Sequence, residues 1–450
     1  MRRLFGTDGV RGIANEFLDC GRAFQIGAAV ATVLHGKRRQ RPLVLLGCDT
    51  RISSSMLCAA VTAGLCSAGA DVMQLGVIPT PAVAYLVGKY RAHAGVMISA
   101  SHNPYEFNGI KLFNEEGFKF PDELEERIES IVLDGSPAPI VARGDAIGAI
   151  TVAERAIPDY LDHLRAVTPN SLHGLHIAVD CANGSASRTA QELFGSLGAV
   201  CEMLSDSPDG VNINDGCGST HIEALAEYVR AHKLDAGIAF DGDADRLLCV
   251  DERGEVVDGD MIIAVLALDM KERGKLARDT VVGTVMTNYG FGRFCEENGL
   301  HFCATKVGDR YVLERMLLDG YSIGGEQSGH IIFRDFATTG DGQLTAAQLL
   351  ALMKRSGKPL SRLASIMHRY PQTLVNLTVT PEAKISFFTD PQIQQLLHET
   401  EHRIEGHGRL LVRPSGTEPL LRVMMEGEDE EETRRMTEEV AQQIKTILEC

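Results

Sequence analysis

Two loops of the sequence carry the side chains best suited to chemistry. The first lies in residues 96–111, where an apolar run ends at small residues and delivers Ser101, His102, Asn103 and Pro104. Proline fixes its own φ and restricts the residue before it, so the Asn-Pro pair ends regular structure and leaves the Ser101 hydroxyl on a stiff loop after a strand. A serine presented in this way is a candidate nucleophile, although the same residue types also build ordinary turns.

The second loop holds three carboxylates at alternate positions, Asp241, Asp243 and Asp245, directly after the apolar residues 237–240. Three like charges repel one another unless a cation lies among them, and oxygen ligands on a short loop suit a hard divalent ion such as Mg²⁺. The spacing resembles the start of an EF-hand loop but departs from it at Arg246, where that loop needs glycine. We therefore expect a magnesium site at the end of a strand.

Three further segments concentrate polar side chains and glycine. Residues 322–330 end an apolar run with Glu-Gln-Ser-Gly-His, and residues 413–422 combine two arginines, two hydroxyl groups and a glycine. Paired arginines and exposed backbone N–H groups are what a phosphate dianion needs, so residues 413–422 are a candidate phosphate loop. Residues 5–12 form a glycine-dense turn that contains Arg11, which is either a phosphate or carboxylate contact or a capping or surface arginine.

Composition restricts the class of protein. The 450 residues are 44% hydrophobic and 23% charged, as in an ordinary globular chain with room for about three or four domains. A net charge of −17 argues against binding to nucleic acid or an anionic membrane. Eleven cysteines without a C-x-x-C pair, and the absence of an apolar segment long enough for a signal or a membrane span, predict a cytoplasmic protein with reduced thiols.

Apolar strand patterns alternate with helical patterns along most of the chain, which predicts α/β domains with doubly wound, largely parallel sheets. The order of strand, helix, strand, helix and a strand that ends in a polar loop occurs three times, so we predict three tandem domains of a common repeat. The last part alternates like antiparallel strands before an amphipathic helix, as in a smaller C-terminal α+β domain. The predicted domains are residues 1–150, 151–254, 255–369 and 370–450.

Taken together and in this order, the motifs Phe-Gly-Thr-Asp-Gly-Val-Arg-Gly, Ser-Ala-Ser-His-Asn-Pro, Asp-Gly-Asp-Ala-Asp-Arg, Gly-Glu-Gln-Ser-Gly-His and Arg-Pro-Ser-Gly-Thr-Glu-Pro resemble the α-D-phosphohexomutase superfamily. The resemblance covers essentially the whole chain, and the combination is far more specific than any single motif. It implies four domains around a central cleft that holds one active site. It also implies the following roles: Ser101 as phosphoserine; Ser101, Asp241, Asp243 and Asp245 as ligands of one Mg²⁺; Arg246 as a catalytic cation; Glu326, Ser328, Gly308 and Asp309 at the sugar; and Arg413, Ser415, Gly416, Thr417 and Arg422 at a phosphate.

The implied chemistry agrees with these residue types. Moving a phosphoryl group between two hydroxyls of one sugar is easiest when the enzyme donates its own phosphoryl group, forms a sugar bisphosphate and takes back the other phosphate. The metal ion, Arg246 and Lys111 would neutralise charge on the transferring group. Lys111 and His330 are both candidates for the base that accepts the hydroxyl proton, and the sequence does not decide between them.

Gln327 and residues 307–310 resemble the glucosamine-specific branch of the superfamily. This implies that a small phosphosugar, glucosamine 6-phosphate, is converted to glucosamine 1-phosphate through glucosamine 1,6-bisphosphate, a step that would feed UDP-N-acetylglucosamine and cell-wall synthesis. Phosphomannomutase or phosphoglucomutase activity is the alternative within the superfamily. A catalytically silent phosphosugar sensor is the alternative from another class, but binding alone would not require Ser101, the three aspartates and Lys111. Both a monomer and a homodimer fit the sequence.

Overall fold

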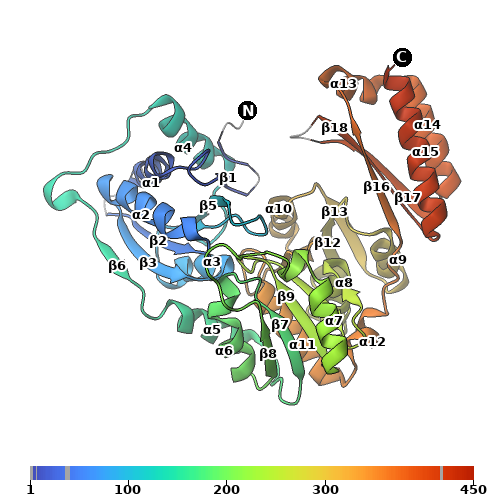
Figure 1. Cartoon of the computed structure of the whole chain (residues 1–450), viewed down its shortest axis with the longest axis horizontal. Coiled ribbons are helices and arrows are strands. Elements are labelled where there is room, and N and C mark those ends of the chain that lie inside the picture. The colour runs from blue at the N-terminus through green and yellow to red at the C-terminus, as the bar shows by residue number, and fades with distance from the viewer. Residues whose placement is uncertain (1–3, 7, 36–40, 416–418, 450) are drawn as a thin grey trace. The chain divides into compact units, whose positions relative to one another are not determined.

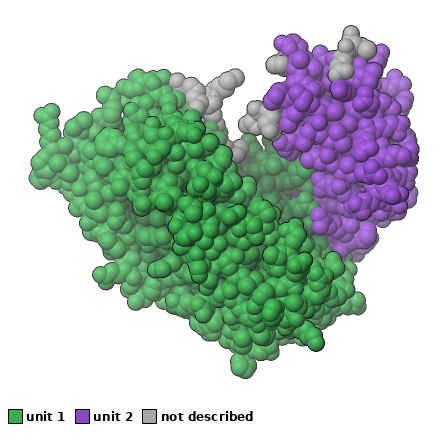
Figure 2. Space-filling model, viewed as in Figure 1, with its two compact units in different colours: residues 1–286, 300–366 green, residues 287–299, 367–450 purple. Residues whose placement is uncertain are grey.

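The structure is a computed structural model of the chain and describes residues 4–6, 8–35, 41–415 and 419–449. The chain divides into two compact units, shown in green and purple in Figure 2. Unit 1 comprises residues 1–286 and 300–366, and unit 2 comprises residues 287–299 and 367–450. Among the described residues, no helix is both long enough and apolar enough to cross a membrane.

The first sheet of unit 1 has the strand order β1-β5-β4-β2-β3-β6. The strands β2, β3, β4 and β6 run parallel, whereas β5 is antiparallel to both β4 and β1. The bounds of these strands are β1 (Val10–Ile13), β2 (Leu43–Cys48), β3 (Asp71–Val77), β4 (Ala94–Ile98), β5 (Phe107–Asn114) and β6 (Ile150–Val152). The accompanying helices are α1 (Cys20–His35), α2 (Ile52–Ser67), α3 (Thr80–Lys89) and α4 (Asp122–Asp134).

Successive side chains of a strand point to opposite faces, and this alternation decides how the helices cover the first sheet. Val44 and Leu46 belong to the hydrophobic core that one face of the sheet forms with α1, α2 and α4. Figure 1 shows these three helices beside the first sheet. Gly47 and Gly95 face α3, where an added Cβ would lie 2.7 Å and 3.0 Å from Val83. Glycine at these positions therefore lets α3 pack closely on β2 and on β4, the strand that leads to Ser101.

The second and third sheets repeat this plan. The second has the order β11-β10-β9-β7-β8 and the third has the order β13-β12-β14-β15. Their strands are β7 (His176–Asp180), β8 (Val200–Leu204), β9 (Ala236–Phe240), β10 (Leu247–Asp251), β11 (Val256–Val257), β12 (Thr280–Thr284), β13 (His301–Thr305), β14 (Ile323–Gly325) and β15 (Ile331–Phe333). The helices beside them in unit 1 are α5 (Ala156–Val167), α6 (Ala190–Ser196), α7 (Glu223–His232), α8 (Gly259–Glu272), α10 (Asp309–Asp319), α11 (Gly342–Ser356) and α12 (Leu360–Ala364).

In each sheet of unit 1, a parallel strand ends in a polar loop and the chain then returns as an antiparallel strand. The pairs are β4 with β5, β9 with β10, and β14 with β15. The expected alternation of strands and helices is confirmed, and each sheet combines parallel pairs with antiparallel pairs at one edge. The hairpins matter for the site because both ends of each polar loop are fixed by strands.

Unit 2 has a three-stranded antiparallel sheet with the order β16-β18-β17. Its elements are β16 (Gln372–Thr378), β17 (Gly408–Pro414), β18 (Leu420–Gly427), α9 (Tyr289–Glu297), α13 (Pro381–Thr389), α14 (Pro391–Ile404) and α15 (Glu430–Glu449). Val423 and Met425 of β18 share a buried core with Ile444 of α15. Helix α9 belongs to unit 2 although it falls within residues 255–369, because Asn288 donates from Nδ2 to the Tyr370 carbonyl (3.0 Å) and to Glu426 (3.1 Å).

A buried carboxyl group at the start of α11 makes the stability of unit 1 depend on pH. Asp341 accepts a hydrogen bond from the Leu344 N–H (2.9 Å), and the Tyr160 hydroxyl donates to both of its oxygens (3.0 and 2.9 Å). Burial raises the pKa of Asp341 from its ordinary value of 3.8 to about 6, although these hydrogen bonds act in the opposite direction. The folded chain therefore binds this proton more tightly than the unfolded chain does.

We expect the contribution of Asp341 to the free energy of unfolding to fall as pH rises from 3.8 through about 6. Over this range the carboxyl group ionises, and the folded state must then hold a buried charge. Asp341→Asn cannot ionise and keeps a side-chain oxygen for the helix cap. Its stability relative to the parent should therefore rise across this window and stay constant above it. Urea unfolding at a series of pH values measures this, with Asp162→Asn, at an exposed site on α5, as the control. Parallel pH profiles for the parent and Asp341→Asn would contradict the assignment.

Candidate active site

The Ser101 hydroxyl lies where loops of the first and second sheets meet. Ser101 follows β4 with a left-handed backbone (φ 55°), and its residue surface is 1% exposed. Its Oγ donates to Oδ2 of Asp241 at 2.6 Å. The structure thus brings the predicted nucleophile together with the first of the predicted metal ligands, 140 positions away in sequence.

Two side chains that the sequence reasoning missed hold the Ser101 loop. Arg51 is ion-paired with Asp49 at 2.9 Å, and its Nη2 donates to the carbonyls of Ser101 (2.9 Å) and Asn103 (2.8 Å). The amide of Asn214 donates to the same two carbonyls at 2.9 and 3.1 Å. The available signal for Arg51 was its place just after β2, because ligands collect at the carboxyl ends of parallel strands.

The three predicted metal ligands form one buried group. Asp241, Asp243 and Asp245 each offer a carboxylate oxygen, and these atoms lie within 4.8 Å of one another. Oδ1 of Asp243 and Oδ1 of Asp245 are buried without a hydrogen-bond partner. Burial, and then the charges of Asp245 and Asp243, raise the pKa of Asp241 well above its ordinary value. A hard divalent cation would satisfy these oxygens and relieve the repulsion, so the residues fit such an ion. No other acidic, His or Cys group of this kind occurs among the described residues.

Lys111 lies against this group on β5, opposite Met97 of β4. Its Nζ contacts Asp243 at 2.7 Å, Asp245 at 3.1 Å and Asp8 at 3.2 Å. Burial lowers the pKa of Lys111, but attraction to these three carboxylates outweighs it and leaves the pKa well above its ordinary value. Lys111 is therefore a fixed positive charge beside the candidate metal site.

Arg246 and His330 link the second and third polar loops through an isolated antiparallel bridge. Burial lowers the pKa of Arg246, but attraction to Asp241 and Asp245 outweighs this effect and leaves the pKa above its ordinary value. The guanidinium therefore stays charged. His330 is 3% exposed, and its Nε2 lies 3.3 Å from the Gly340 backbone nitrogen. Nε of Arg246 and Nδ1 of His330 are buried without a hydrogen-bond partner. Both side chains thus keep polar atoms available next to the carboxylate group.

The remaining predicted residues of unit 1 lie around the same site or on its loops. Oε1 of Glu326 accepts a hydrogen bond from the Gly308 N–H at 3.0 Å, which joins the sugar loop to the start of α10. Ser328 is exposed at the tip of that loop. Arg11 is ion-paired with Asp8 and donates to the side chain of Asn103 at 3.4 Å, so it lies beside the Ser101 loop.

The predicted phosphate loop belongs to unit 2. Arg413 on β17 is directly opposite Arg422 on β18, and burial followed by the charge of Arg422 lowers the pKa of Arg413. Like charges directly opposite each other disfavour strand pairing, and a bound anion would offset that repulsion. The backbone N–H of Ser415 donates to the Leu420 carbonyl at 2.8 Å. Gly416 and Thr417 lie outside the described residues.

Comparison with known proteins gives matches along the whole chain. Models of the phosphoglucomutase/phosphomannomutase family match in order: alpha/beta/alpha domain I at residues 2–138, domain II at 158–254, domain III at 258–370 and the C-terminal domain at 374–443. Among solved structures, a family protein from Burkholderia thailandensis has a TM-score of 0.84 at 22% identity, covering 100% of this chain and 98% of that one. N-acetylphosphoglucosamine mutase of Aspergillus fumigatus, solved with GlcNAc-6P and magnesium, has a TM-score of 0.68 at 17% identity, covering 98% and 95%.

Curated relatives are much closer in sequence. The phosphoglucosamine mutases of Ruminiclostridium cellulolyticum and Caldicellulosiruptor saccharolyticus are 50% and 53% identical, and each match covers 100% of both chains. At this identity and coverage, the relationship extends over all four parts of the chain, including both compact units. The chain therefore belongs to the phosphoglucomutase/phosphomannomutase family and, within it, to the phosphoglucosamine mutases.

Proposed function

We propose that this enzyme interconverts glucosamine 6-phosphate and glucosamine 1-phosphate by way of a phosphoserine at Ser101. The observation that carries the proposal is the 2.6 Å hydrogen bond from the Ser101 hydroxyl into a buried group of three carboxylates, with Lys111 beside it. These contacts support the proposal, because a phosphoryl relay needs a nucleophile, a metal site and a positive charge close to one another. The product would supply amino-sugar and cell-wall synthesis.

The reaction has two transfers through one intermediate. In the first, the bond between phosphorus and Ser101 Oγ breaks while a bond forms to the free hydroxyl oxygen of the sugar, whose proton passes to a base. The base returns this proton to Oγ, the leaving group, so the products are glucosamine 1,6-bisphosphate and Ser101 with a free hydroxyl. In the second, the other phosphate of the bisphosphate moves back to Ser101 Oγ, whose proton passes by way of the base to the sugar oxygen that this phosphate leaves. No phosphate is consumed overall.

Asp241, Asp243 and Asp245, with an oxygen of the phosphoserine, would hold the cation, which we propose to be Mg²⁺. When bound, Mg²⁺ supplies positive charge to the phosphoryl oxygens in the transition state. Lys111 and Arg246 contribute fixed positive charge from the protein itself, and their surrounding carboxylates keep both side chains charged.

For the base, the contacts favour His330 over Lys111. Lys111 is ion-paired with three carboxylates, and a charged ammonium has no lone pair with which to accept a proton. His330 is buried beside Arg246 and has a ring nitrogen, Nδ1, without a partner. We propose that Nδ1 accepts the proton of the attacking hydroxyl, and that Lys111 serves as the cation.

The other predicted residues complete the binding of a small phosphosugar. We propose that Glu326, Ser328 and Gly308 line the sugar subsite beside Asp309. We also propose that Arg413, Ser415, Gly416, Thr417 and Arg422 bind the phosphate that is not reacting, and that Arg11 is a further contact of the active site. We further infer that the enzyme acts in the cytoplasm, as a monomer or homodimer. All ten described cysteines are free thiols.

An assay of several hexose phosphates tests the proposed function. We expect kcat/KM to be higher for glucosamine 6-phosphate than for glucose and mannose phosphates. The difference in transition-state binding free energy should be about 1–3 kcal/mol, because these sugars differ at one polar group or one stereocentre. Activity should require added Mg²⁺ after chelation. Equal or better turnover of mannose 1-phosphate would favour a phosphomannomutase. Tight binding of all these phosphosugars without turnover of any would favour the sensor.

A further inference from the structure

A row of alternating charges runs from the candidate metal site to His330. Lys111, which contacts two of the metal-site carboxylates, also contacts Asp8 at 3.2 Å. Lys119 is ion-paired with both Asp8 and Asp309. The Asp309 carboxylate then lies 3.4 Å from Nε2 of His330. The sequence motifs contain only some of the residues in this row. No pattern in the sequence indicates that Asp8 and Lys119 lie near Asp309.

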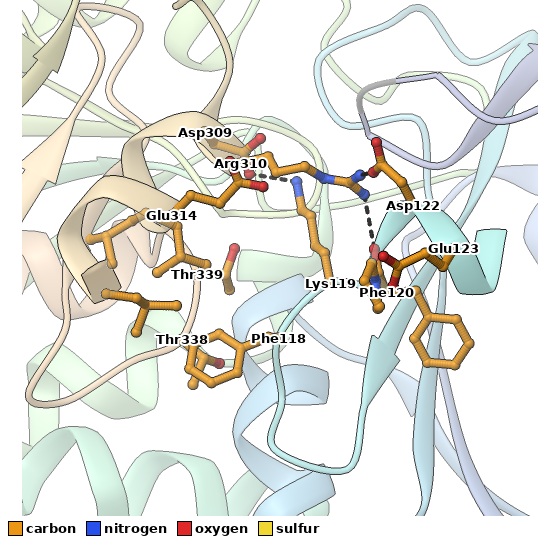
Figure 3. A pocket seen from close by; sticks show the side chains of 14 residues that line it. Phe118, Lys119, Phe120, Asp122, Glu123, Asp309, Arg310, Glu314, Thr338 and Thr339 are labelled. Carbon is orange, nitrogen blue, oxygen red and sulfur yellow. Dashed lines mark hydrogen bonds and ion pairs between the residues drawn. The ribbon is translucent and has the colours of Figure 1, made fainter. Parts of the chain in front are cut away.

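The position of Asp309 is fixed from several directions. Asp309 is the first residue of α10, and the next residue, Arg310, is ion-paired with Asp122 and donates to the Phe120 carbonyl at 3.0 Å. Figure 3 shows Lys119 reaching toward Asp309, and Arg310 reaching toward Asp122 and Phe120, across one pocket. The start of α10 is therefore fastened to the segment after β5, and the Asp309 carboxylate has little freedom to move away from His330.

Two neighbours of His330 Nε2, the Asp309 carboxylate and the Gly340 N–H, favour opposite positions for the proton of the neutral imidazole. A carboxylate beside Nε2 favours a proton there, whereas the Gly340 N–H, 3.3 Å from the same nitrogen, favours a lone pair. Burial would raise the pKa of Asp309, but the attraction of Lys119 and His330 outweighs it and lowers the pKa, so Asp309 is ionised. An ionised carboxylate is the stronger of the two partners. Asp309 and His330 are 3.4 Å apart without a hydrogen bond in this structure, and catalytic hydrogen bonds are often long before substrate binds.

We propose that Asp309 is a positioning residue that keeps the proton of His330 on Nε2 and leaves the Nδ1 lone pair free for the sugar hydroxyl. This inference rests on the proposed function. It changes the expected role of Asp309 from a contact of the sugar to a residue that positions His330, because its carboxylate contacts Lys119 and His330 and acts on the substrate through the imidazole. The same logic orients the histidine of hydrolase triads, where a buried carboxylate selects the tautomer. Lys119 holds Asp309 from the other side.

Kinetics of Asp309 variants give the first test. Asp309→Asn should lower kcat by about 10–100-fold, the usual cost of losing an outer carboxylate that orients a histidine, and should change KM little. Asp309→Glu restores the charge and should recover part of the loss. Asp319→Asn, at the other end of α10 and paired with Arg315, is the matched control and should retain parental activity. A loss in Asp309→Asn that lies wholly in KM, or no loss at all, would overturn the proposal.

A double-mutant cycle and a spectroscopic measurement give the second test. In a His330→Gln background, Asp309→Asn should have almost no further effect on kcat, because its partner is gone. Ring-¹⁵N NMR of histidine-labelled protein should show the Nε2–H tautomer of His330 in the parent and a shift toward Nδ1–H in Asp309→Asn, with His330→Gln identifying the signal. An unchanged tautomer, or equal losses in both backgrounds, would refute the role. The NMR result needs no turnover, so a failure of the proposed substrate assignment would remain distinguishable from a failure here.

Discussion

Asp243→Asn is expected to remove most of the activity while leaving the fold intact. The substitution keeps the size of the side chain and one of its oxygens, but replaces a charged ligand by a weaker neutral one in a group built for a hard cation. Metal charge at the phosphoryl oxygens contributes several kcal/mol, so a loss of about a thousandfold in kcat is the expected scale. The same substitution also weakens the contact with Lys111, now 2.7 Å long.

Thermal unfolding with and without Mg²⁺ separates loss of metal from loss of fold. Mg²⁺ should raise the melting temperature of the parent, because it binds the folded carboxylate group, and should raise that of Asp243→Asn much less. Asp206→Asn, at an exposed aspartate that follows β8, is the control and should behave like the parent. If Asp243→Asn keeps parental turnover and the full Mg²⁺-dependent stabilisation, the three carboxylates are not the metal site.

Ser101→Ala should abolish turnover and leave the protein without a phosphoryl group. Removing a covalent nucleophile typically costs at least about a thousandfold in kcat, even when binding is preserved. The fold should tolerate the change, because alanine has the same Cβ at this left-handed position and the hydroxyl makes its described hydrogen bond to Asp241 alone. The loop itself stays held through its carbonyls by Arg51 and Asn214.

Intact-mass measurement checks this variant. The parent should carry one phosphoryl group, Ser101→Ala should carry none, and Ser207→Ala, an exposed serine after β8, should match the parent in mass and activity. Phosphorylation of the alanine variant at a stoichiometry equal to the parent's, or full activity without it, would reject Ser101 as the group that relays the phosphate.

The sequence was sufficient to predict features that depend on local pattern. A buried strand that ends in small and polar residues is visible at Ser101, at Asp241 and at Glu326, and the structure has a strand and loop at each of these places. The return of the chain as an antiparallel strand was not predicted, because a fully buried strand has the same apolar pattern in either direction. That direction places Lys111 back beside the carboxylate group.

Contacts between distant side chains were also beyond the sequence. Arg51 reaches the Ser101 loop, and Lys119 reaches Asp309, across 50 and 190 positions respectively. Lys119 does not differ in type or spacing from the many surface cations of the chain, so no local signal marks it. The place of Arg51 after β2 indicates the edge of the sheet where ligands collect, but not which loop the side chain contacts. Similarly, α9 joins unit 2 through the contacts of Asn288 with Tyr370 and Glu426, which only the folded chain brings together.

Transfer of a labelled phosphoryl group from the enzyme tests the central claim most directly. The enzyme is first phosphorylated with glucosamine 1,6-bisphosphate that carries labelled phosphorus, freed of excess label, and mixed with unlabelled glucosamine 6-phosphate in the presence of Mg²⁺. If Ser101 relays the phosphoryl group, the label leaves the protein during the first turnover and appears in the bisphosphate and in glucosamine 1-phosphate. If glucosamine 1-phosphate accumulates while the label stays on the protein, the phosphoserine mechanism is wrong.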